Sequence, residues 1–277
     1  MKIVDTHCHL IYRDRLSYPW LDSVPALNRD CTLADYLPQA RAAGITDIIH
    51  MEVDVAESDL AREAAFTASL GDGVVGTIAG CRPESVSFPA YLEQIAANPR
   101  VKGLRRILHT QPDECAEAPI FADNLKRLSG TGLTFDLCVL PRQIPIAMTL
   151  VRACPDVQFV LDHCGVPNVK DRELDPWRGL IREIAAMPNV ACKLSGIVAY
   201  ADPASWTVDD LRPFAEHVIA VFGWDRMVWG SDSPVCTLSA SLGQWMAATH
   251  GLLEGASESE KARLFGLNAT RIYRLDR

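Results

Sequence analysis

Two histidines stand one residue apart near the start of the chain, at the end of the apolar run Ile-Val-Asp-Thr-His-Cys-His. Because side chains alternate between the two faces of a β-strand, His7 and His9 should point the same way and Cys8 the opposite way. Two imidazoles held side by side can share one metal ion or bind one substrate oxygen. The pair indicates a site whose chemistry depends on the other groups that converge there.

Two later apolar runs also end in groups suited to such a site: His163 ends VQFVLDH and Asp232 ends MVWGSD. A lone histidine there is more often structural, and a lone aspartate can cap the next helix. Together with His7 and His9, however, they predict a single zinc or manganese ion with an open position for water. Asp232 would ligate the ion or take the proton from the water, or do both in turn.

Two cationic positions are candidates for substrate binding. Arg105 and Arg106 lie on opposite faces of one apolar run, so only one should point into the site, and the run itself leaves open which one does. Lys193 has three interpretations: a Schiff-base nucleophile, a cation that anchors the substrate, or a salt-bridge partner of Asp136 or Glu52. Anchoring and salt bridging are the favoured two, because a charge in an apolar strand needs a partner.

Three further features complete the predicted site. His50 is expected to line its floor, and Trp20, in the long aromatic segment 10–31, is expected to form an apolar wall over the substrate. A binuclear centre with a bridging carbamylated lysine would need a lysine further along the fourth strand. That strand offers only Lys102, at its beginning, so a mononuclear or metal-free centre is predicted.

The elements that must position these residues alternate along the whole chain. Apolar strand-like runs occur at 3–9, 46–53, 74–80, 101–108, 133–139, 157–163, 190–195 and 227–232. Segments with helical periodicity lie between them, at 32–43, 56–70, 88–98, 119–130, 142–154, 175–187 and 208–222, with another at 257–274. Eight such units predict a parallel (β/α)₈ barrel that forms a single α/β domain over residues 1–277. Its active site should lie at the carboxyl ends of the strands.

Composition narrows the class of protein. The chain has 277 residues, a net charge of −8 and no long basic run, which argues against nucleic acid or an anionic membrane as the main partner. Nine scattered cysteines without a Cys-x-x-Cys motif are typical of reduced thiols. With no signal peptide and no long apolar stretch predicted, we expect a cytoplasmic enzyme with a small-molecule substrate, which could form a homo-oligomer.

The sequence also resembles a known family. The segments DTHCHLIYRDRLSYPWL, VKGLRRIL, FVLDHCGVP, CKLSG and WGSDSPV are similar, in this order over essentially the whole chain, to the sugar-lactonase-like branch of the amidohydrolase superfamily. This branch includes the fuconolactonase and pyrone-dicarboxylate lactonase group. The resemblance implies a (β/α)₈ fold and hydrolysis of a cyclic ester. It implies His7, His9, His163 and Asp232 as active-site residues and Arg105 as a substrate contact.

The resemblance, together with these residues, implies a function in carbohydrate metabolism: ring opening of a lactone, with a neutral sugar lactone favoured over a dicarboxylated one. One divalent ion, zinc or manganese, would polarise the carbonyl, and the alternative is polarisation by the imidazoles alone, with the metal dispensable. Two other functions stay open. They are a metal-dependent decarboxylase of the same superfamily and a barrel that binds a ligand without catalysis.

Overall fold

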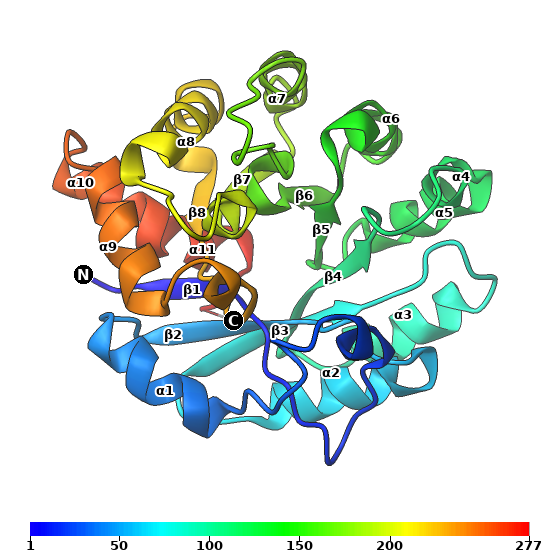
Figure 1. Cartoon of the computed structure of the whole chain (residues 1–277). Helices are drawn as coiled ribbons and strands as arrows, with labels where there is room; N and C mark the ends of the chain where they lie inside the picture. Colours follow the sequence, from blue (N-terminus) through cyan, green and yellow to red (C-terminus); the bar gives the residue numbers. More distant parts are fainter. Residues whose placement is uncertain (277) are drawn as a thin grey trace.

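Eight parallel strands form one sheet in sequence order in the computed structural model, which describes residues 1–276 (Figure 1). The strands are β1 (Val4–Cys8), β2 (Asp47–Met51), β3 (Val74–Gly80), β4 (Val101–Ile107), β5 (Thr134–Cys138), β6 (Gln158–Leu161), β7 (Val190–Leu194) and β8 (Met227–Trp229). Each falls within the range predicted from the sequence. The predicted (β/α)₈ barrel is therefore confirmed.

The barrel closes where the ends of β1 and β8 meet. The Asp232 amide donates to the His7 carbonyl at 2.8 Å, and the His9 amide donates to the Ser233 carbonyl at 2.7 Å. Nearby, the Thr6 hydroxyl donates to the Trp229 carbonyl at 2.7 Å. The histidine pair and Asp232 thus sit on the two segments that complete the ring.

Helices accompany the strands along the described chain, and most of them form an outer layer around the sheet (Figure 1). They are α1 (Leu33–Ala42), α2 (Leu60–Ser69), α3 (Phe88–Ala96), α4 (Glu114–Glu117), α5 (Pro119–Leu125), α6 (Ile144–Ala153), α7 (Trp177–Ala185), α8 (Val208–Phe222), α9 (Leu242–Leu252), α10 (Glu258–Ala262) and α11 (Asn268–Ile272). Side-chain caps mark the first residue of several helices. For example, Thr207 and Asp210 form a capping box at the start of α8.

Apolar side chains divide between the outside and the inside of the barrel. A large cluster between sheet and helices includes Phe135 and Phe159, whereas a smaller cluster inside the barrel includes Ile49 and Val160. Residues of α11 and the adjoining Tyr273 belong to the inner cluster. The C-terminal helix therefore packs against the barrel interior as well as against β8.

Strand β1 is irregular just before the site. Its register with β2 shifts between Asp5 and Cys8, as a β-bulge does, and bulges commonly re-aim side chains next to active sites. The Asp5 carboxylate accepts hydrogen bonds from the His7 amide at 3.1 Å, from the Ser231 amide at 2.8 Å and from the Tyr36 hydroxyl. This buried carboxylate ties the backbone of β1 to the loop after β8.

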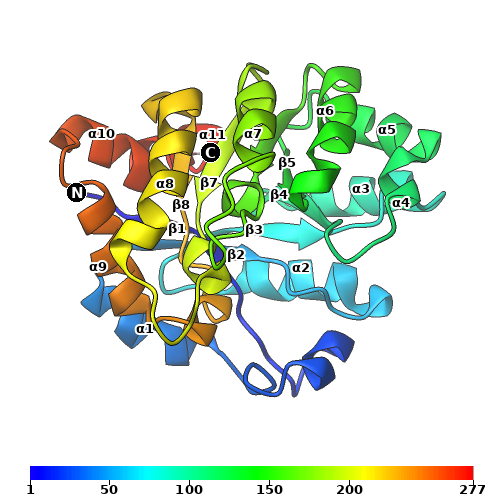
Figure 2. The ribbon, with the colours of Figure 1, turned by 45° about the horizontal axis from the view of Figure 1, so that its top comes forward.

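The segment 10–31 stands out from the body of the barrel as the dark-blue chain between β1 and α1 (Figure 2). It has a small apolar core of its own, which includes Ile11, Tyr18 and Leu27. The Trp20 indole donates to the Val53 carbonyl at 2.7 Å, so the segment is fastened to the loop after β2. The apolar cluster and this hydrogen bond make the segment a packed wall beside the barrel.

Two further predictions concern the state of the cysteines and the presence of membrane-spanning helices. All nine cysteines are free. Among residues 1–276, no helix combines the length and the apolar character that crossing a membrane requires.

Gly230, directly after β8, allows the close approach of β8 to β1. A Cβ atom at this position would lie 2.6 Å from the His7 Cβ and 3.2 Å from the His7 amide nitrogen. We expect Gly230→Ala to lower the free energy of unfolding by roughly 1–3 kcal/mol, because backbone must move to relieve the overlap. Urea denaturation measures this change.

The matched control is Gly179→Ala in α7, where an added Cβ meets nothing within 4 Å. This variant should keep or raise stability, since alanine favours helix over glycine by up to about 1 kcal/mol. An unchanged denaturation midpoint for Gly230→Ala would contradict the close packing described here.

Candidate active site

A cavity of about 390 Å³ opens at the carboxyl ends of the strands. His9, His163 and Asp232 line it, as do Arg105 and Trp20. His7 lies just beneath, fully buried, with its imidazole ring centroid 4.9 Å from that of His9. The structure thus brings together the four residues expected to be catalytic.

His7, His9 and Asp232 form the tightest group. The two Nε2 atoms are 3.2 Å apart, and Asp232 Oδ1 lies 3.6 Å from His7 Nε2 and 3.5 Å from His9 Nε2. His9 Nδ1 faces the carbonyls of Met51 and Glu52, at 3.1 and 2.9 Å, and must donate its proton to them. The Nε2 lone pair of His9 is therefore directed at the group.

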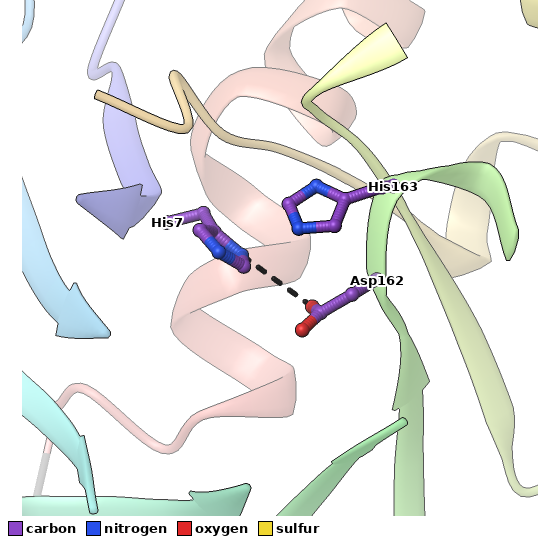
Figure 3. A group of neighbouring side chains, drawn as sticks. All are labelled: His7, Asp162 and His163. Carbon is purple, nitrogen blue, oxygen red and sulfur yellow. Dashed lines mark ion pairs between the residues drawn. The ribbon is translucent and has the colours of Figure 1, made fainter. Parts of the chain in front are cut away.

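The ring of His163 lies beside this group. Its ring centroid lies 4.4 Å from that of His7, and His7 in turn pairs with Asp162 at 3.5 Å (Figure 3). His163 Nδ1 is 2.9 Å from the Ser195 hydroxyl and 3.9 Å from Asp232 Oδ2. His163 stands at the turn that follows β6, and this position lets the ring face both Asp232 and β7.

The backbone is strained at His163 and Asp232, each of which follows a strand. His163 has a φ of 51° and Asp232 a φ of 58°, the left-handed region that non-glycine residues seldom adopt. Gly196, at φ +67°, makes room between them, because a Cβ there would lie 2.4 Å from His163 Nδ1 and 2.8 Å from Asp232 Oδ2. Only glycine fits at this position.

The donor set fits a divalent metal ion. Ligands at about 2.0–2.1 Å from a tetrahedral zinc ion lie roughly 3.3 Å from one another, close to the 3.2–3.6 Å that separate His7 Nε2, His9 Nε2 and Asp232 Oδ1. Asp232 Oδ2 is buried and has no hydrogen-bond partner among the described residues. A second group of potential ligands, His7, Asp162 and His163, shares His7 with the first.

Burial sets the protonation of the site. Desolvation holds the pKa of His7 well below its ordinary value, lowers that of His9 to about 3 and also lowers that of His163, with nearby Lys193 or Arg105 adding to each shift. Metal coordination needs neutral imidazole, so this environment suits ligation. Burial also raises the pKa of Asp232 to about 6, the range in which a carboxylate can exchange protons.

Lys193 lies inside the barrel below the histidines, with no exposed surface. Its ammonium is 2.7 Å from Asp136 Oδ2, 2.9 Å from Asp162 Oδ1 and 3.2 Å from His7 Nδ1. Burial opposes its charge, but the two carboxylates hold its pKa above the ordinary value. Of the three interpretations, the geometry supports the salt bridge to Asp136; Lys193 does not reach the cavity, so an anchoring role in direct contact with substrate does not fit.

Arg105 is the arginine that points inward, and Arg106 points outward. Arg105 Nε is 2.6 Å from Glu52 Oε1, and its terminal nitrogen NH1 lies 3.2 Å from His7 Nε2. Arg106 instead pairs with Glu84 at 2.7 Å on the helix side of the sheet. Arg105 therefore lines the cavity as expected.

The expectation for His50 has to be corrected. The inner face of β2 is formed by Ile49 and Met51, so His50 points the other way, toward α2, where its Nε2 lies 3.6 Å from Glu63. His50 is fully buried outside the barrel and does not line the cavity. Trp20, by contrast, lies in the cavity wall where the sequence placed it.

Three residues that the sequence did not single out take part in the site. Asp162 supports both His7 and Lys193, and the adjacent His163 was its only signal in the sequence. His109 lines the cavity, and its Nδ1 lies 3.0 Å from the Cys138 sulfur. These two come together only because β4 and β5 are neighbours, and no spacing in the sequence indicates it.

The amidohydrolase family model matches residues 4–275 of the chain. An L-fucono-1,5-lactonase from Burkholderia ambifaria is 29% identical over 284 residues, which cover 99% of this chain and 96% of that protein. The chain therefore belongs to the amidohydrolase family, as its motifs predicted.

Solved structures agree with this assignment. The structure resembles that of a zinc-bound amidohydrolase from Burkholderia multivorans, with a TM-score of 0.89, 25% identity and 99% of each chain covered. It also resembles a putative 2-pyrone-4,6-dicarboxylic acid hydrolase from Pseudomonas putida, with a TM-score of 0.77, 22% identity, and 100% and 98% of the two chains covered. The second likeness concerns the fold.

Lys193 should be essential for stability. Lys193→Met leaves Asp136 and Asp162 buried without their ammonium partner, which we expect to lower the free energy of unfolding by about 3–5 kcal/mol. Chemical denaturation measures the loss. Lys126→Met, which removes an exposed ammonium 2.8 Å from Asp123, serves as the control and should leave the denaturation midpoint in place. Equal stability of the two variants would contradict the role assigned to Lys193.

Proposed function

We propose that this amidohydrolase opens the ring of a lactone by water attack on its carbonyl. The observation that carries the proposal is the Asp232 carboxylate, which faces the cavity beside three neutral histidines and has one oxygen without a partner. The lactonase named among the relatives, 29% identical over nearly the whole chain, supports a cyclic ester as substrate. A sugar lactone is the form that this relative's name suggests.

Asp232 acts as the general base in this reaction. Its carboxylate takes a proton from water as the water oxygen bonds to the lactone carbonyl carbon, and a tetrahedral intermediate forms. The intermediate collapses when the bond from that carbon to the ring oxygen breaks, and Asp232 returns the proton to the departing alkoxide. The product is an open-chain hydroxy acid.

His7, His9 and Asp232 would hold a divalent metal ion, with His163 beside them. When bound, the ion would polarise the carbonyl and lower the pKa of water. Arg105 provides a fixed positive charge next to His7 that favours the developing oxyanion, and Lys193 with Asp162 holds the His7 ring from below. Zinc is the first candidate because a zinc-bound relative shares the fold at 25% identity.

Removal of the general base tests the mechanism. Asp232→Asn should lower kcat for lactone hydrolysis by roughly 10²–10⁴-fold, because the amide cannot accept the proton. The fold should persist, as circular dichroism and the thermal midpoint would show. Asp54→Asn is the matched control: it changes a carboxylate of the same cavity, 3.4 Å from Arg82, and should cost far less. Near-normal turnover by Asp232→Asn would refute the assigned base.

Metal binding is tested separately from turnover. After chelation and dialysis, titration calorimetry should detect one zinc ion per chain, and saturating zinc should raise the thermal midpoint. His9→Asn should abolish this binding, whereas His250→Asn, on the exposed side of α9, should retain it. Full lactone turnover by the chelated enzyme would instead favour the metal-free mechanism. Carbon dioxide release from aromatic or enoic acids would favour a decarboxylase.

A further inference from the structure

We propose that the cavity selects uncharged lactones that carry an apolar substituent, with the substituent packed against the wall formed by segment 10–31 and residues 234–238. This inference rests on the proposed lactonase function, specifies its substrate class, and departs from the sugar lactone that the relative's name suggests. A cavity of about 390 Å³ falls in the range of small-molecule sites and accommodates a six-membered ring with a short side chain.

One side of the cavity is apolar. Ile11, Trp20, Val24, Leu27 and Val235 all line it, and all five also belong to the small apolar cluster of segment 10–31 or pack against it. Ile11 and Leu27 are buried within the cluster, whereas Trp20, Val24 and Val235 are partly exposed and face the cavity. An apolar ligand group at this surface would complete the cluster and remove its side chains from water.

The rim of the same wall carries an exposed leucine. Leu238 is 40% exposed and is one of four large hydrophobic residues of the described chain that are exposed; of these four, it is the one that lines the cavity. A substituent that extends from the ring toward the rim would cover it. Exposed apolar surface at a cavity mouth is typical of ligand-binding grooves.

Charge in the cavity disfavours anionic substrates. Among its described lining residues, Arg105 is the only arginine or lysine, and Glu52 and Asp162 already engage its guanidinium at 2.6 and 3.4 Å. Two carboxylates, Asp54 and Asp232, line the cavity as well. A carboxylated or sulfonated lactone would lose hydration there without gaining a free side-chain cation, and the proposed metal ion would be occupied by the lactone carbonyl.

Hydrogen-bonding groups are too few on the apolar side for a ring with many hydroxyls. Ser23 is the neutral polar side chain that segment 10–31 contributes, and Thr110, Tyr200 and His109 belong to the remaining lining. A polyhydroxylated ring would place several hydroxyls against Val24 or Val235, where they lose water without a partner. The ligand that fits this cavity therefore has one polar edge and one apolar edge.

Steady-state kinetics on a matched set of δ-lactones tests the proposal. The zinc-supplied enzyme is assayed by acid release with δ-valerolactone and its methyl, ethyl and propyl derivatives at the carbon next to the ring oxygen. Glucono-δ-lactone and 2-pyrone-4,6-dicarboxylate supply the polyhydroxylated and anionic members. We expect kcat/KM to rise about three- to fourfold per buried methylene, and both polar compounds to fall below the parent lactone.

Substitutions in the apolar wall test whether it contacts the alkyl substituent of the lactone. Leu238→Ser and the nearly isosteric Val24→Thr should reduce the ratio of kcat/KM for the propyl lactone to that for δ-valerolactone several-fold. Val86→Thr is the matched control, since Val86 is 87% exposed outside the cavity lining, and it should leave the ratio unchanged. Equal ratios in all three variants would overturn the assignment of the wall.

The two proposals fail in different ways. If the enzyme opens δ-valerolactone but prefers glucono-δ-lactone or the dicarboxylate to every alkyl lactone, the substrate class proposed here is wrong and the lactonase function stands. If no member of the set is opened, with zinc or without it, both proposals are wrong.

Discussion

The ammonium of Lys193 is the group on which the rest of the site depends. It sits inside the barrel without contact with water, between Asp136 of β5 and Asp162 after β6, and beside His7 of β1. Burying three charged groups is costly unless their geometry satisfies all of them. The strand register that brings Asp136, Asp162 and Lys193 together also places the ring of His7 beneath the cavity.

Charge is arranged in layers along the barrel. The lower layer holds the ammonium of Lys193 with the carboxylates of Asp136 and Asp162. Above it lies a layer of imidazoles that burial keeps neutral, together with Asp232. The lower layer satisfies its own charges, so the upper one can offer lone pairs and a carboxylate to a ligand. Because the buried ammonium already has its own carboxylate partners, the Asp232 carboxylate stays available to react.

Much of this could be predicted from the sequence, and the exceptions have physical causes. Eight apolar runs predicted the strands, and alternation placed His7 with His9 and separated Arg105 from Arg106. The same reasoning failed for His50. Both faces of β2 are buried, and its sequence DIIHM does not alternate between apolar and polar residues, so the sequence does not show which residues point into the barrel. The pairing of His109 with Cys138 arises from neighbouring strands, which a linear pattern does not contain.

Tyr273, just beyond α11, donates a hydrogen bond from its hydroxyl to Asp136 at 3.1 Å, across 137 residues of sequence. The charge network around Lys193 is therefore completed by a segment that carries none of the proposed catalytic residues. A chain that contains every one of those residues would still hold Asp136 without this partner until α11 has docked against the inner cluster. Assembly of the site thus depends on the docking of a helix that takes no part in the proposed chemistry.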